Sequence, residues 1–174
     1  MVNTTIRRGT AADALGIAQV QVQSWDETYR GVLPDAYIDA RTVEHRRALW
    51  VRVLNDASSF VWVADASGVI VGFINGGPGR QIDAAHAGDG EVYALYLLKA
   101  LHNRGVGRAL FDAARKTFAQ SGYAYFVVTV LSENPSTVFY ERMGGVHTSD
   151  GQLSIDERSV AERVYRFEVV WTSE

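Results

Sequence analysis

The chain contains no cysteine, and this absence removes several kinds of chemistry. Disulfide bridges, thiolate nucleophiles and cysteine-ligated metal sites all need a thiol, so none of them is available. No apolar run reaches the roughly 18 residues that a membrane-spanning helix requires, and the N-terminal residues lack the apolar core of a signal peptide. The sequence therefore predicts a soluble, cytoplasmic protein with no membrane partner and no metal site.

The sequence also lacks an excess of basic residues. It has 17 Lys and Arg against 20 Asp and Glu, which gives a net charge of −3. Such a chain has no general attraction to nucleic acid, so none is expected as a partner, and a small cationic amine is electrostatically easier to accept than a phosphate-rich substrate. The 174 residues are 47% hydrophobic, enough for one sizeable core. We therefore expect a single domain over residues 1–174.

Strand and helix patterns alternate along the chain. Runs of β-branched and aromatic residues predict strands at 4–8, 60–64, 69–75, 92–98, 125–131, 146–149 and 164–170. Apolar residues three and four positions apart predict helices after Thr10, over 42–55 and from Val106. The first helix begins at a capping-box pair, Thr10 and Asp13. Its expected apolar stripe is Leu15, Ala18, Val22, Trp25 and Tyr29.

Between these elements we expect a turn at 65–68, a mobile, glycine-rich loop at 76–89 and a polar turn at 150–158. The alternation of elements predicts an α/β (α+β) fold, with a mixed, largely antiparallel sheet covered by helices on both faces.

The stretch from 91 to 121 carries the clearest functional signal. An apolar strand is followed by a short glycine-containing loop and then by a helix with one apolar face, formed by Val106, Leu110, Ala113, Ala114 and Phe118. The first N–H groups of a helix have no partner within it and carry the positive end of its dipole, so this start is an anion site. Gly105 and Gly107 let an anion approach the backbone, and Arg104 and Arg108 supply positive charge.

Two common phosphate motifs do not fit this loop. A nucleotide P-loop needs Lys and then Ser or Thr after its last glycine, whereas Gly107 is followed by Arg108 and Ala109. A dinucleotide-binding fingerprint needs a glycine at position 110, which is Leu110. The anion is therefore expected to belong to another kind of ligand.

The loop His102-Asn103-Arg104-Gly105-Val106-Gly107 resembles the coenzyme A loop of the GNAT superfamily of acetyl-CoA-dependent N-acyltransferases, whose pattern is Q/R-x-x-G-x-G/A. His102 departs from this pattern, because the first position is normally Gln or Arg. A second segment, V-L-x-x-N-x-x-x-x-F-Y-E-x-x-G over 130–144, is similar to the family's other coenzyme-binding segment. In it, Asn134 is a suitable N-cap, and Gly144 suits the exit of a short helix.

The resemblance implies a GNAT fold and an enzyme that transfers the acetyl group of acetyl-CoA directly to a primary amine. Tyr140 occupies the position of the family's general acid, although a core tyrosine with a satisfied hydroxyl is the alternative reading. Glu91, on one strand face with Tyr93, Leu95 and Leu97, is the candidate base, directly or through water. A solvent-facing strand-end carboxylate is the alternative for Glu91, and His86 in the 76–89 loop is the alternative base.

The family's cofactor contacts carry over to the matching positions. The implied cofactor-binding residues are Leu95, Tyr96, Leu97, His102, Asn103, Arg104, Gly105, Val106, Gly107, Arg108, Asn134 and Tyr140. Backbone from 95 to 97 would pair with the pantetheine arm and hold the oxyanion. The residues expected near the amine are Trp25, Asp26, Tyr29, Tyr37 and Tyr93. Aromatic rings there suit a cation but equally suit an ordinary core.

Several functional alternatives stay open. The chain could be a non-catalytic acyl-CoA-binding or regulatory module, or a transferase that uses another acyl donor or a hydroxyl acceptor. The acceptor itself is open among polyamines, amino-acid derivatives, aminoglycoside-like antibiotics and protein N-termini. The family often dimerises through its last strands, and residues 164–171 are more apolar than one buried face requires, so a homodimer is expected.

Overall fold

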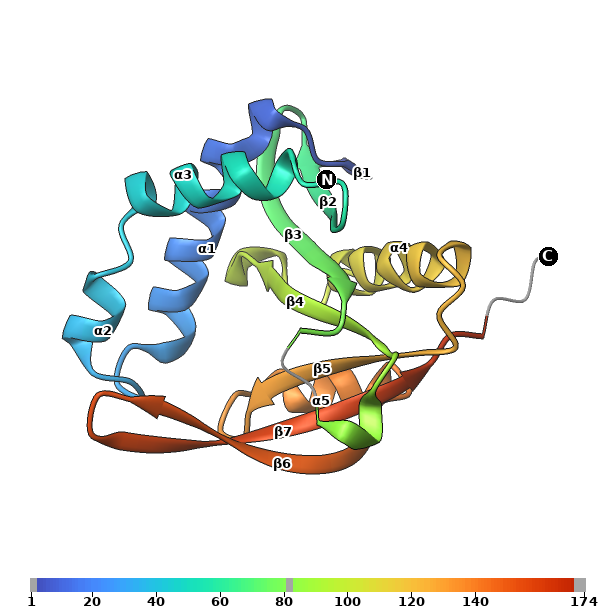
Figure 1. Ribbon diagram of the computed structural model, residues 1–174. Coiled ribbons are helices and arrows are strands. Elements are labelled where there is room, and N and C mark those ends of the chain that lie inside the picture. Colours follow the sequence, from blue (N-terminus) through green and yellow to red (C-terminus); the bar gives the residue numbers. More distant parts are fainter. Residues whose placement is uncertain (1–2, 81–82, 171–174) are drawn as a thin grey trace. The chain divides into compact units, whose positions relative to one another are not determined.

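The computed structural model describes residues 3–80 and 83–170, which form two compact units (Figure 1). Unit 1 comprises the chain up to Gly76 together with Ala94–Ala114, and unit 2 comprises Gly77–Tyr93 and the chain from Arg115 onward. Seven strands form one sheet in the order β1-β2-β3-β4-β5-β7-β6. All the pairings described below are antiparallel except β4 with β5, so the predicted mixed, largely antiparallel α/β fold is confirmed.

The strands of unit 1 begin with β1 (Thr4–Arg8), which pairs with β2 (Phe60–Ala66) through Ile6 and Ala64. The next strand, β3 (Val69–Pro78), follows a turn of only two residues, Ser67 and Gly68, both with positive φ. This turn is shorter than the four-residue turn expected, because β2 continues through Asp65, whose carboxylate accepts the Gly68 N–H at 2.6 Å. The Asp65 side chain thus stabilises a tight turn, in which only Ser67 and Gly68 lie outside the strands.

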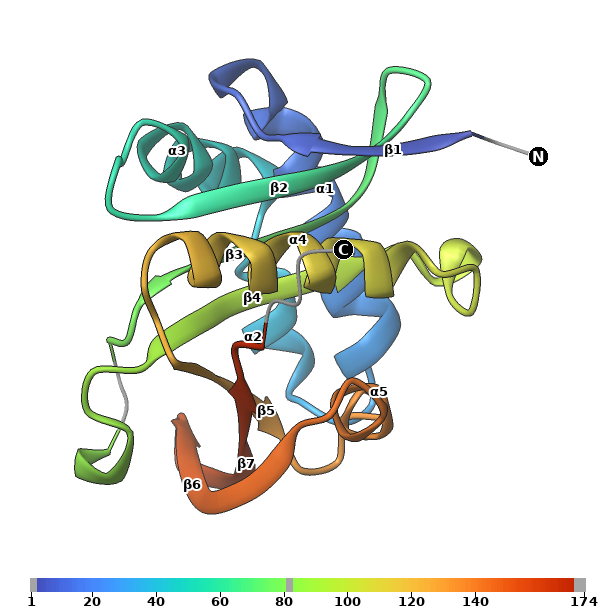
Figure 2. The ribbon, with the colours of Figure 1, turned by 90° about the vertical axis from the view of Figure 1, so that its right-hand side faces the viewer.

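Helices cover both faces of the strands in unit 1 (Figure 2). On one face α1 (Ala14–Tyr29) and α3 (Val43–Leu54) pack against Val63 and Phe73, and against Ala94 and Tyr96 of the central strand β4 (Gly90–Leu97) and Leu98 just after it. On the other face lies α4 (Val106–Gln120), and a side chain at Gly72 of β3 would collide with Leu97 at 2.8 Å and approach Leu110 at 3.4 Å. Gly72 therefore lets β3, β4 and α4 approach closely.

The first helix begins where the sequence predicted, but its buried face differs from the predicted one. A 3-10 turn, η1 (Ala11–Asp13), precedes α1, and the Asp13 carboxylate accepts the Thr10 N–H at 2.8 Å, as the capping-box spacing predicted. The predicted apolar stripe of α1 was wrong at Leu15, which is 42% exposed. The buried face instead runs through Ile17, Ala18, Gln21 and Ser24, because buried polar side chains take positions that an apolar pattern does not mark.

A short helix that the sequence analysis missed, α2 (Asp35–Asp39), joins α1 to α3. It is too short to show periodicity. The predicted helix over 42–55 is confirmed, since Thr42 caps α3 by accepting the His45 N–H and Asn55 is its last flanking residue.

Unit 2 has a core of stacked aromatic rings. Phe118 of α4 stacks on Phe126 of β5 (Tyr125–Leu131) at 4.7 Å between centroids, and Phe126 stacks on Phe167 of β7 (Arg158–Glu168) at 5.0 Å. All three side chains are at most 1% exposed. The parallel pair of β4 and β5 runs through Gly90–Val92 and Phe126–Val128, which fixes the start of β4 above this core.

The last two strands are longer than predicted. β6 (Val146–Ile155) and β7 form a hairpin in which Asp150 pairs with Arg163 and Ile155 with Arg158. The polar turn expected over 150–158 was therefore wrong, and the turn is confined to Asp156 and Glu157, with φ of 52° at Asp156. Most side chains of β6 are exposed, so it lacks the apolar alternation by which strands are recognised.

The segment expected as a loop over 76–89 contains regular structure. β3 extends to Pro78, and a 3-10 turn, η2 (Ala84–His86), precedes β4, while residues 81 and 82 lie outside the described part. Trp171, part of the predicted dimer segment, also lies outside it. Among the described helices, none is long and apolar enough to cross a membrane.

Candidate functional site

The loop before α4 has the backbone geometry of an anion site. A 3-10 turn, η3 (Lys99–Leu101), leads into it, and Asn103 and Gly105 have φ of 60° and 81°. The Ala109 N–H donates to the Gly105 carbonyl at 3.0 Å and is the first to close a helical turn. The N–H groups of 106 to 108 therefore have no acceptor within the helix and are available to a ligand.

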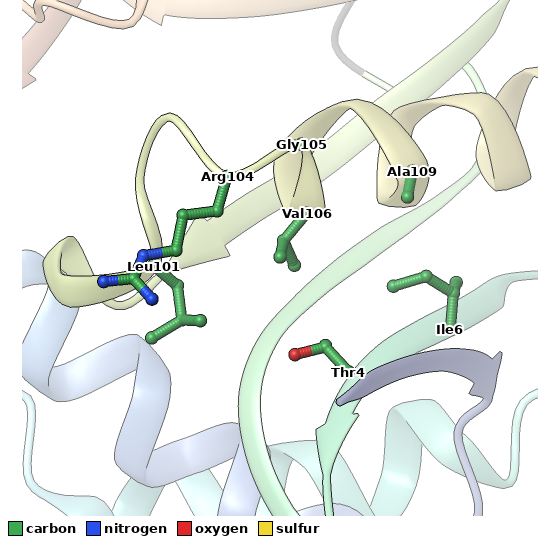
Figure 3. A pocket seen from close by; sticks show the side chains of 7 residues that line it. All are labelled: Thr4, Ile6, Leu101, Arg104, Gly105, Val106 and Ala109. Atoms are coloured by element: carbon green, nitrogen blue, oxygen red, sulfur yellow. The ribbon is translucent and has the colours of Figure 1, made fainter. Parts of the chain in front are cut away.

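A cavity of about 520 Å³ opens beside this helix start, within unit 1 (Figure 3). The side chains of Thr4, Ile6 and Val106 point toward one another across it, and Arg104 extends along its edge toward Leu101. Within residues 3–80 and 83–170, neither Arg104 nor Arg108 makes an ion pair or a hydrogen bond through its side chain, and both are exposed. The loop thus offers unpaired N–H groups and two uncommitted guanidiniums, which fits a phosphate-bearing cofactor.

His102, the departure from the family pattern, turns toward the central strand. Its Nε2 lies 2.9 Å from the Leu97 carbonyl oxygen, so Nε2 carries the proton and donates to β4. Only Nδ1 is left for another partner. The structure thus gives His102 a role in joining the loop to β4, which the sequence did not indicate.

The second half of β4 carries the positions expected to hold the cofactor arm. Leu95, Tyr96 and Leu97 are half-buried, and they lie beyond Gly90–Val92, the stretch for which the described part of the chain shows pairing with β5. The Tyr96 hydroxyl accepts the Trp25 indole N–H at 2.8 Å, which ties α1 to this stretch of β4. Backbone and side chains of β4 therefore meet the residues expected near the acceptor.

Three of the predicted acceptor residues come together at the end of α1. The Trp25 ring lies 4.7 Å from Tyr29 and 6.1 Å from Tyr37 between centroids. One face of Tyr37 and one of Trp25 are occupied by a cation of the chain, because the Arg41 guanidinium lies 3.6 Å from the Tyr37 centroid and 4.8 Å from that of Trp25. An arginine of the chain itself already makes the cation–π contacts.

Asp26, expected beside them, is placed differently. Its carboxylate accepts from the Arg30 Nε at 2.9 Å, and Arg30 also donates to Asp39 at 2.8 Å. The Asp26 side chain is 53% exposed. This ion-pair group fixes the connection between α1 and α2, which is a structural role for Asp26.

Glu91 and Tyr93 lie in unit 2 at the start of β4. Glu91 is 8% exposed, and its Oε2 accepts the Arg80 backbone N–H at 2.7 Å, so it does not face solvent. The Tyr93 hydroxyl donates to the Pro78 carbonyl, and the Arg80 guanidinium lies 3.4 Å from the Tyr93 ring centroid. The segment before β4 therefore contacts both side chains, and Glu91 is a buried carboxylate held by a backbone donor.

Tyr140 lies in α5 (Thr137–Arg142) and is 5% exposed. Its ring is surrounded by aromatic neighbours in unit 2, with centroids 5.4 Å from Phe139, 6.2 Å from Tyr165 and 6.4 Å from Phe167. Such packing fixes the direction of the phenol. It suits both a positioned acid and a core tyrosine.

Asn134 is not the N-cap that the sequence suggested. Its Oδ1 accepts the Ser136 N–H at 2.8 Å in a turn, and α5 begins only at Thr137, after Ser136. The predicted cap was wrong because an Asn before Pro can equally form a side-chain turn of its own. The predicted exit is confirmed by Gly144, with φ of 91°.

His86, the alternative base, is buried and engaged at both ring nitrogens. Its Nδ1 lies 2.5 Å from Asp83 Oδ1 and its Nε2 lies 2.9 Å from Thr148 Oγ1. With 3% exposure it is not the surface histidine that a lone loop position suggests. It connects η2 to β6 and has no nitrogen left for an acceptor amine.

Sequence reasoning missed Arg41 and Arg46, two basic residues near the aromatic cluster. Both are half-buried, and Arg41 makes the ring contacts described above. The available signal was the stretch RTVEHRR over 41–47, in which basic residues face a single acid, Glu44.

Comparisons with known proteins agree on one family. Residues 21–145 match the family described as Acetyltransferase (GNAT) family. The uncharacterized N-acetyltransferase YuaI of Bacillus subtilis (strain 168) is 33% identical over 152 residues, covering 87% of this chain and 85% of YuaI.

Two solved structures share the fold at low identity. YncA of Salmonella typhimurium, solved with its cofactor acetyl-CoA, has 18% identity and a TM-score of 0.73, covering 99% of this chain and 97% of its own. The PaiA N-acetyltransferase of Thermoplasma acidophilum, solved with coenzyme A, has 20% identity and a TM-score of 0.69, covering 95% and 99%. Given the family match over most of its length, the chain belongs to the acetyltransferase (GNAT) family of enzymes.

Proposed function

We propose that this enzyme transfers the acetyl group of acetyl-CoA directly to a small primary amine, with Tyr140 as general acid and Glu91 as general base. The observation that carries the proposal is the start of α4, where Asn103 and Gly105 have positive φ and Arg104 and Arg108 have no partner in the described ranges. Two unpaired guanidiniums at the positive end of a helix are electrostatically unfavourable unless an anion binds there. Acetyl-CoA supplies an acetyl group activated as a thioester.

The chain's own groups have clear tasks toward the cofactor. The N–H groups of Val106, Gly107 and Arg108, together with the guanidiniums of Arg104 and Arg108, would bind its phosphates. The backbone of Leu95 to Leu97 would accept and donate hydrogen bonds to its amide-bearing arm, and an N–H of this stretch would stabilise the oxyanion. Asn134 and Tyr140 are the remaining residues that we propose contact the cofactor.

A free alkylamine has a pKa of about 10.4 and a thiol one of about 8.5. The reaction therefore needs one group that takes a proton from the amine and one that gives a proton to the leaving thiolate. Glu91 is buried, carries a carboxylate and is fixed by the Arg80 N–H, so it is suited to take a proton from the attacking amine, directly or through water. The phenol of Tyr140 stays protonated at neutral pH and is suited to protonate the leaving thiolate.

On the acceptor side, Trp25, Tyr29 and Tyr37 form one side of the proposed amine site, and Tyr93 is the fourth proposed contact. The Trp25–Tyr96 hydrogen bond supports this assignment, because it joins the aromatic cluster to the β4 stretch proposed to hold the cofactor arm. Asp26 is proposed here only as part of the frame, since Arg30 occupies its carboxylate.

Tyr140→Phe tests the assignment of the acid. The change keeps the ring and its packing and removes only the hydroxyl, so folding and cofactor binding should change little. The rate of the chemical step should fall about 10²- to 10⁴-fold, the usual effect of losing a general acid. The deficit should narrow as pH rises, because a thiolate leaves with less help in alkaline buffer.

Thiol release from acetyl-CoA measures this rate, and Tyr123→Phe is the matched control, since Tyr123 also packs edge-on against a phenylalanine, at 5.6 Å from Phe118. An equal deficit at every pH would assign Tyr140 to positioning, and full activity would make it a core residue. A non-catalytic binder would instead be stabilised by acetyl-CoA and show no turnover with any amine. Turnover with alcohols but not amines would point to a hydroxyl acceptor.

A further inference from the structure

Two arginines of unit 1, Arg41 and Arg46, have no acidic partner in the part of the chain that the structure describes. Both side chains are half-buried, and the Nε atom of each is buried without a hydrogen-bond partner. Arg41 donates from NH1 to the Tyr37 carbonyl, and within residues 3–80 and 83–170 no carboxylate forms an ion pair with either guanidinium. A buried charged donor without an acceptor is destabilising, so such a pair requires an explanation.

The two guanidiniums also repel each other. Burial, together with the charge of Arg41, lowers the pKa of Arg46, which means that the positive form of Arg46 is disfavoured where it lies. The neighbouring polar groups are the hydroxyls of Tyr37 and Tyr96, which are close enough to Arg46 to affect its ionisation. The site therefore has excess positive charge and two hydroxyls, and no carboxylate among the described residues forms an ion pair there.

Three other arginines of the protein have carboxylate partners. Arg7 forms a two-point ion pair with Asp13, Arg30 binds Asp26 and Asp39, and Arg166 binds Asp89. Asp26 is only one residue from Trp25, yet it is directed to Arg30 and not to Arg41. The missing carboxylate thus distinguishes Arg41 and Arg46 from these three arginines, and the burial of both Nε atoms distinguishes them from the exposed Arg104 and Arg108.

We propose that Arg41 and Arg46 bind an anionic oxygen-bearing group of the acetyl acceptor, so that the acceptor is a small zwitterion, an amine that also carries a carboxylate or a phosphonate. A planar guanidinium can donate two parallel hydrogen bonds to a carboxylate or a phosphonate. Two guanidiniums with hydroxyls nearby offer enough donors for all the oxygens of such a group. The inference rests on the proposed function. It places the anionic end of the acceptor beside the hydroxyl of Tyr96, a residue of the β4 stretch whose backbone is proposed to stabilise the oxyanion.

In this proposal the aromatic cluster of Trp25 and Tyr37 orients an arginine instead of binding the substrate amine. Trp25 and Tyr37 each already have one face in contact with a cation, the Arg41 guanidinium, so binding the substrate ammonium is not their main role. The rings instead hold Arg41 in place, as cation–π contacts do for a guanidinium that must keep its orientation. Polyamines and aminoglycoside-like compounds, which carry only positive charge, are then poor acceptors because they would meet two arginines.

The test compares acceptors in matched pairs on the unmodified enzyme. Amino acids and aminoalkylphosphonates are screened by thiol release from acetyl-CoA, and each active acid is compared with its neutral carboxamide or ester. The acid should have a KM lower by about 10- to 100-fold with kcat within a few-fold, the effect expected for charged hydrogen bonds to a bound group. Either acid supports the site, and the two series show which one it prefers.

Arg46→Gln and Arg41→Gln should remove this preference. Each should raise KM for the acid about 10- to 100-fold and leave KM for the carboxamide within about 2-fold. Arg47→Gln is the control, because Arg47 is an exposed neighbour on the same helix. Calorimetry of the acid with the coenzyme A-loaded protein gives the same comparison without turnover.

Equal KM values for acids and carboxamides, or a preference for polyamines, would overturn this inference and leave the acetyltransferase proposal standing. No thiol release with any amine would overturn both. A loss of acid preference in Arg47→Gln as large as in Arg46→Gln would also overturn it, because the effect would then come from general surface charge.

Discussion

Replacing Gly90 with alanine should destabilise the protein, for a reason visible in the ring stack of unit 2. Gly90 begins β4, and a methyl group on its Cα would lie 2.6 Å from Phe118 Cδ1 and closer still to Cε1. Real Cβ atoms do not come so near to another carbon, so the ring or the strand must move. The ring cannot retreat freely, because Phe118 is stacked on Phe126, which is stacked on Phe167.

The expected loss follows from two opposing effects. Overpacking a buried site costs about 1–3 kcal/mol, and the upper half of this range applies where three stacked rings must shift together. Alanine also lowers the conformational entropy of the unfolded chain, which stabilises the folded state by about 0.4–1 kcal/mol. The net decrease in the free energy of unfolding should be about 2 kcal/mol, which corresponds to about 4–8 °C in Tm for a chain of this size.

Urea unfolding followed by fluorescence and circular dichroism measures this loss, and Gly151→Ala is the matched control. Gly151 is also a strand glycine, but a methyl group there would meet only the Glu162 side chain, at 3.4 and 3.7 Å. Its stability should change by less than about 0.5 kcal/mol. If Gly90→Ala and Gly151→Ala unfolded at the same urea concentration, the ring stack would not be rigid and the reasoning would be refuted.

A double variant checks the mechanism. Phe118→Leu removes the ring edge that opposes the new methyl group, so Gly90→Ala should cost less in that background than in the wild type. Simple addition of the two losses would mean that Phe118 is not the obstacle.

Three further predictions concern the cofactor loop, acid stability and assembly. Gly107→Val should put a side chain where a phosphate binds and abolish measurable coenzyme A binding in calorimetry with the fold intact by circular dichroism; unchanged affinity would contradict the loop assignment. Hydrogen bonds from Arg7, which outweigh the opposing effect of burial, lower the pKa of Asp13 to about 2. Because the folded pKa is below the unfolded one, this pair contributes about 2 kcal/mol above pH 4, lost as pH falls toward 2. Urea unfolding from pH 6 to pH 2.5 should show that Asp13→Asn is less stable at pH 6 and falls less steeply below pH 4; parallel curves would contradict it. Residues 164–171 should mediate a homodimer, and a monomeric mass in light scattering at micromolar concentration would exclude it.

The elements that the sequence predicted well are those whose local pattern and final burial agree. β1 and β5 have the predicted bounds, because runs of β-branched residues end at turn-forming residues on both sides. The apolar face of α4 is confirmed, with Val106, Leu110, Ala114 and Phe118 all buried. In these cases the side chains that define the pattern are also those that form the core.

The sequence failed to predict elements, or parts of them, whose side chains do not follow the usual pattern of buried apolar and exposed polar residues. Strands were predicted at 146–149 and 164–170, but their extension to a long hairpin was missed, because most β6 side chains are exposed and no apolar alternation marks it. The short helix α2 has one buried residue, Ile38, and is joined to Arg30 by ion pairs through Asp35 and Asp39. In the candidate site, motif spacing marked the loop at 102–108, since its chemistry is local in sequence. Arg41 and Arg46 could not be assigned a binding role from the sequence, because that role depends on the folded chain bringing no carboxylate next to them.

The division of the chain between its two units bears on how the protein can be made and cut. The chain passes from one unit to the other after Gly76, Tyr93 and Ala114, so each unit is built from two separate stretches. No single proteolytic cut or truncation can separate the two units cleanly, because a fragment that contains all of one unit also carries a stretch of the other. During synthesis unit 1 has all its segments only after Ala114 has left the ribosome, when β5, β7 and β6 are still to come. The predicted single domain can therefore be checked by pulse proteolysis of nascent chains, which should show no protected fragment that ends before residue 114.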